Sequence, residues 1–168
     1  RAQLNVDINK GFVRPLPIAL PDLAGEVAEE AKLGADIMSV VASDLERSGL
    51  FRPVDKRAFI QDAASLHLGP RFGDWRLINA EALVTGVVTG GEQGGMLDVE
   101  FRLWDVFAGV QMRGLRFATS SDNWRRVAHQ IADAIYQAGY ADQPHLTRSL
   151  KQFIGQTPGQ LLSVSKIK

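Results

Sequence analysis

The stretch that decides the fold is residues 82–119, ALVTGVVTGGEQGGMLDVEFRLWDVFAGVQMRGLRFAT. Its first part, 82–89, is rich in β-branched residues, and glycines crowd the segment 90–95 that follows. Apolar and polar residues then alternate from Met96 to Leu103, which is typical of a strand with one buried face. A turn at 107–109 precedes a further extended run, Val110–Thr119. The stretch therefore predicts a three-stranded antiparallel meander with a glycine-rich hairpin loop.

Two long helices are predicted on either side of this meander. Before it, residues 33–48 place an apolar stripe on one helical face, and Gly49 is a natural stop. After it, apolar residues recur at helical spacing from Trp124 to Ile135, and Gly139-Tyr140 is expected to end that helix. A shorter helix is predicted over Arg71–Asn79. We therefore expect an α/β fold, with a mixed β-sheet packed by two main helices and a short C-terminal helical tail from about residue 144.

The N-terminal region is expected to be extended. Residues 4–8, LNVDI, alternate apolar and polar positions as a half-buried strand does. Residues 15–21, PLPIALP, contain three prolines, which excludes a helix and favours an edge strand or a polyproline-like segment. Residues 50–54 are expected to form an extended connector. The tryptophans Trp75, Trp104 and Trp124 stand in patterns typical of a core or its rim.

Composition excludes several classes of protein. The 168 residues are 45% hydrophobic and 23% charged, as in a soluble domain, and no apolar run is long enough to span a bilayer. There is no cysteine, which excludes disulfides and thiolate chemistry. The chain begins at Arg1 without a leader, so we expect either a processed secretory protein or a fragment. The net charge is zero, with a mildly acidic body over 1–136 and a mildly basic 137–168.

Nothing in the sequence indicates an enzyme. The glycine cluster joins two strands, whereas a phosphate-binding loop must lead into a helix. The three histidines lie far apart, without the spacing of a metal site. The serines lack the glycine context of a nucleophile elbow, and Asp98 and Glu100 beside Arg102 indicate solvated cross-strand pairing. We therefore predict no catalytic residue, no metal and no cofactor.

The segment from Ala134 to Lys151 carries one further pattern. A helix, a Gly139-Tyr140 turn and a second short helix have the geometry of a DNA-reading helix-turn-helix, although composition alone favours an ordinary helical hairpin. Amide and guanidinium groups suit base edges, and hydroxyl and ammonium groups suit phosphates. The residues concerned are Gln143 and Arg148 for bases, and Thr147 and Lys151 for phosphates.

Residues 2–136 resemble the N-terminal domain of the TolB family. The resemblance is carried by ordered pieces along the chain: AQLNVDI (2–8), PLPIALP (15–21), LERSGLFR (45–52), DWR (74–76), ALVTG (82–86), FRLWD (101–105), DNWRR (122–126) and AIY (134–136). It implies an α/β domain that precedes a six-bladed β-propeller in a periplasmic protein of the Tol-Pal system. That system serves cell-envelope integrity, outer-membrane invagination in division and protein import.

The same resemblance implies a partner and a binding segment. The N-terminal strand would bind the inner-membrane protein TolA, and edge pairing is a reasonable physical mode. The propeller, which supplies most of the surface for the lipoprotein Pal, is not in this sequence, so a Pal-like partner is the less expected one. The residues implied are Ala2, Gln3, Leu4, Asn5, Val6, Asp7 and Ile8.

Residues 134–162 resemble instead the second helix-turn-helix of AraC-type transcription regulators. The resemblance is carried by GYADQPHLTRSLK (139–151) and GQTP (155–158), and implies that Gln143, His145 and Arg148 read bases. The chain is thus expected to comprise a TolB-like domain, 1–136, and a helical tail, 137–168. The leading hypothesis is a non-enzymatic periplasmic interaction module, and the alternative is a cytoplasmic, sequence-specific DNA-binding fragment.

Overall fold

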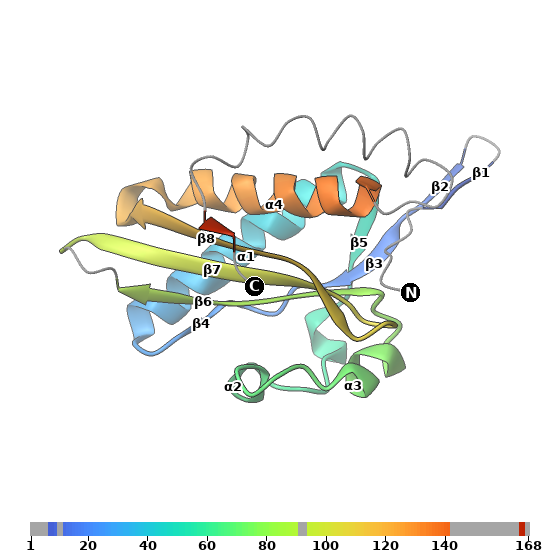
Figure 1. The fold of residues 1–168 in the computed structure, drawn as a ribbon, viewed down its shortest axis with the longest axis horizontal. Helices are drawn as coiled ribbons and strands as arrows, with labels where there is room; N and C mark the ends of the chain where they lie inside the picture. The colour runs from blue at the N-terminus through green and yellow to red at the C-terminus, as the bar shows by residue number, and fades with distance from the viewer. Residues whose placement is uncertain (1–6, 10–11, 91–93, 142–164, 167–168) are drawn as a thin grey trace.

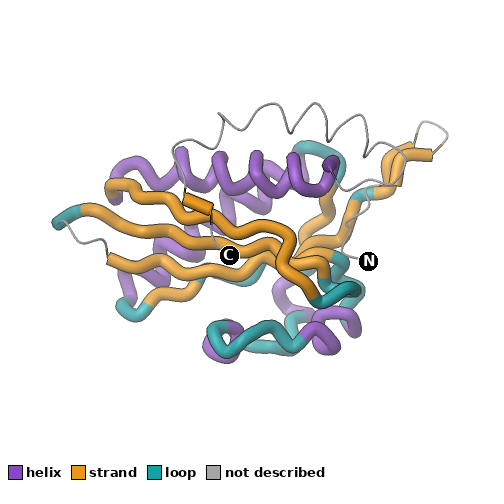
Figure 2. Tube along the Cα trace, in the orientation of Figure 1, coloured by secondary structure: helices purple, strands orange, loops and turns teal. Residues whose placement is uncertain are grey.

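The computed structural model describes residues 7–9, 12–90, 94–141 and 165–166. Figures 1 and 2 show the long helices α1 and α4 along one side of the main sheet and the short helices α2 and α3 on the other. The elements in chain order are β1 (Asp7–Asn9), β2 (Phe12–Arg14), β3 (Leu16–Ala19), β4 (Ala24–Gly25), α1 (Ala28–Arg47), β5 (Phe51–Pro53), η1 (Lys56–Ala58), α2 (Ala63–Leu66), α3 (Phe72–Leu77), β6 (Ala82–Gly90), β7 (Met96–Asp105), β8 (Val110–Ser120), η2 (Ser121–Asn123), α4 (Trp124–Ala141) and β9 (Ser165–Lys166).

The main sheet is mixed, as predicted. Its seven strands follow the order β5-β3-β6-β7-β8-β9, and β4 also pairs with β6. The strands β3, β4 and β5 make the parallel pairings, and β6 to β9 pair antiparallel. The expected α/β class with two main helices is therefore confirmed.

The three strands of the meander are confirmed, and residues 91–93 of the predicted hairpin loop lie outside the described residues. β6 and β7 pair from Ala82↔Asp105 to Gly90↔Leu97, and β8 continues the ladder as far as Met96↔Ser120. Gly109 turns the chain between β7 and β8 with φ +68°, a conformation that suits glycine because it has no Cβ. This three-stranded unit is the frame on which the other elements pack.

The helix α1 begins earlier than its apolar stripe suggested. Its first turn is polar, and the Glu30 carboxylate accepts hydrogen bonds from the backbone amides of Glu26 (3.0 Å) and Val27 (3.2 Å). These bonds satisfy amides that a helix start leaves without partners. The predicted stop is confirmed, since α1 ends at Arg47 and Gly49 follows with φ +76°.

The predicted end of the second long helix is wrong. α4 runs through Gly139 to Ala141. Gly139 is buried, and a Cβ there would lie 2.8 Å from Cζ of Phe51, so its small size lets α4 approach β5. The proposed boundary between residues 136 and 137 falls inside this helix. The tail helix expected from about residue 144 lies outside the described residues.

The proline-rich segment is neither an edge strand nor a polyproline helix. β3 lies inside the sheet between β5 and β6, and all four of its residues are buried. Pairing with β6 begins only at Ile18↔Ala82. Pro17 has no backbone N–H to donate, but it precedes this pairing, so the ladder between β3 and β6 loses no hydrogen bond. The Pro17 carbonyl still accepts a hydrogen bond from the Glu81 amide, at 2.9 Å. A proline is tolerated in an inner strand for this reason.

The expected connector at 50–54 contains a strand. β5 pairs parallel with β3, from Leu16↔Phe51 to Ile18↔Pro53. Its Phe51 is 2% exposed and belongs to the main core, which contains the buried side chains of α1, α4 and one face of the sheet. A three-residue strand is too short for sequence alternation to reveal it.

A second, smaller core lies on the other face of the sheet. Trp75 of α3 is fully buried there with Leu83 and Val106. The ring of Phe59 meets Trp75 edge-on, with centroids 5.0 Å apart. Trp104 packs against this core and Trp124 against the main one, which confirms the predicted places of the tryptophans. The part of the chain that the structure describes holds no helix long and apolar enough to cross a membrane.

Candidate interaction sites

The first candidate site is the N-terminal hairpin. β1 pairs antiparallel with β2, with Asp7 opposite Arg14 and Ile8 opposite Val13. Figure 1 shows this hairpin extending away from the main sheet beyond β3. Asp7 and Ile8 are thus the described part of the predicted partner-binding segment. Its remaining residues lie outside the described part of the chain: Ala2, Gln3, Leu4, Asn5 and Val6.

An ion pair connects the base of the hairpin to the body. Nη2 of Arg14 lies 3.9 Å from Oε2 of Glu81, and the two side chains are 69% and 21% exposed. Burial raises the pKa of the Glu81 carboxyl, and the charge of Arg14 partly opposes this. At this distance and exposure the pair contributes little stability. The outer edge of β1 has no strand partner among the described residues.

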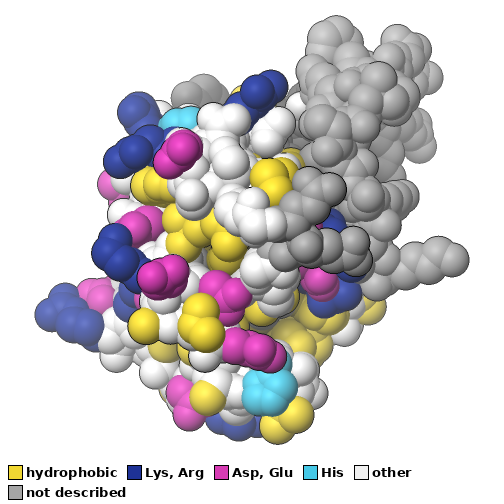
Figure 3. Space-filling view, turned by 90° about the vertical axis from the view of Figure 1, so that its left-hand side faces the viewer, with side chains coloured by type: hydrophobic (Ala, Val, Ile, Leu, Met, Phe, Trp, Pro, Cys, Tyr) yellow, Lys and Arg dark blue, Asp and Glu magenta, His cyan; other side chains and the backbone are white. Residues whose placement is uncertain are grey.

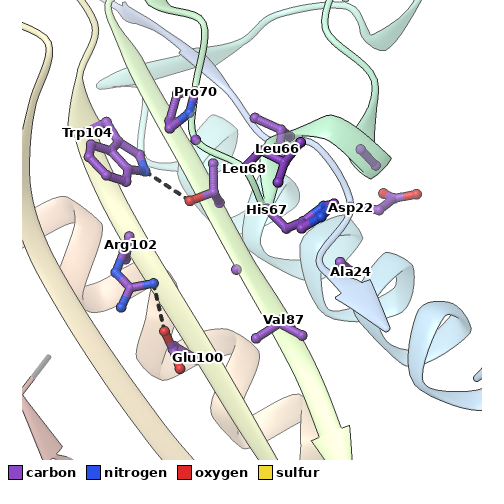
Figure 4. A pocket seen from close by; sticks show the side chains of 14 residues that line it. Asp22, Ala24, Leu66, His67, Leu68, Pro70, Val87, Glu100, Arg102 and Trp104 are labelled. Atoms are coloured by element: carbon purple, nitrogen blue, oxygen red, sulfur yellow. Dashed lines mark hydrogen bonds and ion pairs between the residues drawn. The ribbon is translucent and has the colours of Figure 1, made fainter. Parts of the chain in front are cut away.

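The second candidate site is a groove of about 580 Å³ on the face of the sheet that carries α2 and α3. β6 and β7 form its floor, and the segment from His67 to Pro70 forms one wall beside Asp22 and Ala24. Figure 4 shows the floor residues on two neighbouring strands, with Leu66 at the end of α2 and the following Leu68 on the side of the wall. Leu68 stands at this wall and is 82% exposed. In the space-filling view of Figure 3, apolar, acidic and histidine side chains are intermixed over the surface.

Two polar contacts organise the floor of the groove. Nε1 of Trp104 donates to Oγ1 of Thr85 at 2.9 Å, and Nη1 of Arg102 lies 2.8 Å from Oε1 of Glu100. All four side chains are half-buried. The predicted cross-strand pairing is wrong for these two residues, because the ion pair runs along β7 between residues two positions apart on one face. The floor presents paired charges and a half-buried indole.

A single buried amide holds the wall of the groove. Oε1 of Gln61 accepts from Nε1 of Trp75 at 2.9 Å and from the Arg71 backbone amide at 2.8 Å. Its Nε2 donates to the Gly69 carbonyl at 3.0 Å. Gln61 is 2% exposed, so it fixes the 69–71 loop against α3 without competition from water. No local sequence pattern marks this glutamine, because its partners lie eight to fourteen positions away.

The described residues contain no group of three or more His, Asp or Glu that could bind a metal ion. His67 lines the groove, and Nδ1 of His129 contacts Oδ2 of Asp44 at 2.5 Å, which links α4 to α1. Both histidines are exposed. The residues proposed to contact DNA all lie outside the described residues, so that hypothesis stays a prediction: Gln143, His145, Thr147, Arg148 and Lys151.

The comparisons with known proteins address the body of the chain. A model of the TolB amino-terminal domain matches residues 4–112, which include the hairpin and all the residues that line the groove. The Tol-Pal system protein TolB of Paramagnetospirillum magneticum is 55% identical over 137 residues, or 82% of this chain. The chain belongs to the TolB amino-terminal domain family. It spans 30% of the length of this relative.

Solved structures agree on the fold of this TolB-type domain. The crystal structure of TolB from Acinetobacter baumannii superposes with a TM-score of 0.60 at 24% identity, covering 81% of this chain and 31% of that one. The lipoprotein GNA1162 from Neisseria meningitidis superposes with a TM-score of 0.52 at 14% identity, covering 73% of this chain and 96% of that one. At these identities the likeness concerns the fold alone.

Proposed function

We propose that the chain is the amino-terminal interaction domain of a Tol-Pal system TolB protein, which acts in the periplasm and binds partners without catalysing a reaction. The observation that carries the proposal is the 55% identity to a Tol-Pal TolB over most of the chain. The candidate sites agree with it. They consist of a strand edge and a groove floor with paired charges, which suit binding.

The proposed partner of the hairpin is a TolA-like inner-membrane protein. The binding segment is Ala2–Ile8, and recognition would occur by strand addition, in which main-chain hydrogen bonds give affinity and alternate side chains give specificity. Support comes from the place of Asp7 and Ile8 in a hairpin whose β1 edge has no strand partner among the described residues. A Pal-like partner is the weaker expectation, because the chain spans only 30% of its TolB relative.

The experiment is a calorimetric titration of the C-terminal domain of TolA into the full chain and into a variant lacking residues 1–8. We expect saturable binding to the full chain and none to the variant. A chain lacking residues 165–168 is the matched control, since it loses the opposite terminus, and it should bind like the full chain. Equal affinity for the full chain and the N-terminal deletion, or binding by neither, would contradict the proposal.

A further inference from the structure

The groove on the α2 and α3 side of the sheet offers apolar surface on both its wall and its floor. Leu66, Leu68 and Pro70 line the wall, and the Trp104 indole lies on the floor (Figure 4). The N–H of this indole already donates to Oγ1 of Thr85 at 2.9 Å, so the ring offers an occupant apolar surface alone. This part of the groove therefore suits an apolar side chain.

The acidic and basic side chains that line the groove are already paired within the chain. Asp22 forms an ion pair with Lys56, and Oε1 of Glu100 lies 2.8 Å from Nη1 of Arg102. A strongly charged occupant would have to displace one of these partners, and it would lose its own hydration on entering the groove. The charges of the groove thus disfavour an acidic or a basic segment and are compatible with a neutral one.

The rim of the groove presents an apolar side chain of its own. Leu68 is 82% exposed, the highest value among the large apolar side chains that the structure describes. Its amide donates to the Ser65 carbonyl at 3.1 Å, and the Gly69 amide donates to the Leu66 carbonyl at 3.0 Å. The buried Gln61 side chain also holds the Gly69 carbonyl. Because its turn is fixed in this way, Leu68 loses little conformational freedom when it is buried at an interface.

A projecting leucine beside an apolar groove makes this surface complementary to itself. When two copies meet about a two-fold axis next to the wall, Leu68 of each copy enters the groove of the other, and the same contact forms twice. The net charge of the chain is zero, so two copies approach each other without overall repulsion. A second copy therefore fits both the shape and the charge of the groove.

We propose that the groove binds Leu68 of a second copy of this chain, and that the chain forms a two-fold symmetric dimer through this contact. Each groove is completed by the other copy, whose leucine packs against the Trp104 indole and the apolar wall. The contact is separate from the N-terminal hairpin and does not depend on a TolA-like partner.

Sedimentation equilibrium of the full chain over a wide range of concentrations tests the proposal. We expect the weight-average mass to rise from 18.4 kDa toward twice this value. Leu68→Asp should weaken dimerisation by about a hundredfold or more, because a symmetric dimer loses two buried leucines at once. Leu77→Asp is the matched control and should leave dimerisation unchanged, since Leu77 is 75% exposed at the end of α3 and does not line the groove.

Amide hydrogen exchange locates the contact. Raising the concentration of the full chain should slow exchange in residues 66–69, and it should not do so in Leu68→Asp. Removal of residues 1–8 should leave the dimer intact, which distinguishes this contact from pairing between hairpins. The proposal is overturned if the chain stays monomeric at every concentration, if Leu68→Asp and Leu77→Asp weaken the dimer equally, if protection falls outside the groove, or if the dimer is lost with residues 1–8.

Discussion

The two faces of β7 have opposite characters, although their residues alternate along a single strand. On the face toward α1 and α4, Val99, Phe101 and Leu103 are completely buried. On the other face, Glu100 and Arg102 are half-buried and form an ion pair at the floor of the groove. Burial of apolar surface is the main source of stability, and half-exposed ion pairs contribute little. The covered face therefore stabilises the fold, and the open face is available for contacts.

The largest effect is expected from removing a ring on the covered face. Phe101 is fully buried and its ring stacks on Phe117 with centroids 6.3 Å apart. Phe101→Ala should lower the free energy of unfolding by about 3–5 kcal/mol, because it leaves a cavity. Denaturant unfolding measures this loss. Phe101→Leu is the control and should lose about 1 kcal/mol, since it keeps most of the volume; equal losses would mean that packing does not decide stability here.

A smaller loss of stability is expected where α1 packs against the segment that precedes β4. A Cβ on Gly34 would lie 2.2 Å from the Leu23 carbonyl oxygen, so Gly34→Ala should destabilise by about 1–3 kcal/mol. In a helix with free space the same change is normally stabilising.

The matched control for this change is Gly73→Ala in α3, where a Cβ meets nothing within 4 Å. It should be neutral or should stabilise by up to about 1 kcal/mol. Thermal unfolding of both variants checks the pair. If Gly34→Ala proved as well tolerated as Gly73→Ala, the close packing of α1 against the backbone of Leu23 would be wrong.

On the open face, loss of the Gln61 amide should act locally. Gln61→Ala removes the acceptor of the Trp75 indole and of the Arg71 amide. Because α3 and its loop can open while the sheet remains folded, we expect a global loss of only about 1 kcal/mol. Hydrogen exchange should accelerate at Gly69 and Arg71 and stay unchanged in β7. Equal acceleration in both regions would show that the two cores unfold as one unit.

The smallest effect is expected from the ion pair itself. Arg102→Ala should change the free energy of unfolding by less than about 1 kcal/mol, because both partners retain contact with water. Denaturant unfolding at low and high salt would measure it. A loss comparable to that of Phe101→Ala would remove the distinction between the two faces.

The sequence predicted the elements whose patterns are long. The meander and both long helices carry periodicity over many residues, and Gly49 marked a true helix end. The position of the proline segment inside the sheet could not be predicted. It depends on where pairing with β6 begins, at Ile18↔Ala82, since this leaves Pro17 without need of a backbone N–H donor. Gly139 was read as a stop, but it serves a contact with Phe51 from a distant part of the chain.

The candidate sites depended even more on distant contacts. The strand over residues 4–8 was predicted from its alternation and its binding role from the resemblance, and the described end of this segment, Asp7 and Ile8, lies in β1. The groove arises only when separate elements meet. Gln61 has no local pattern that distinguishes it from surface residues, so periodicity could not have found it.

The parallel pairing of β3 has a consequence for the order in which the chain acquires its structure. Leu16–Ala19 leaves the ribosome or a translocation channel well before Ala82, the residue with which Ile18 pairs. The meander can close through short turns, and β5 can pair with β3 as soon as it appears, but the other side of β3 must wait for β6. Until then one edge of this apolar strand stays unpaired, which makes it a segment that a chaperone would protect.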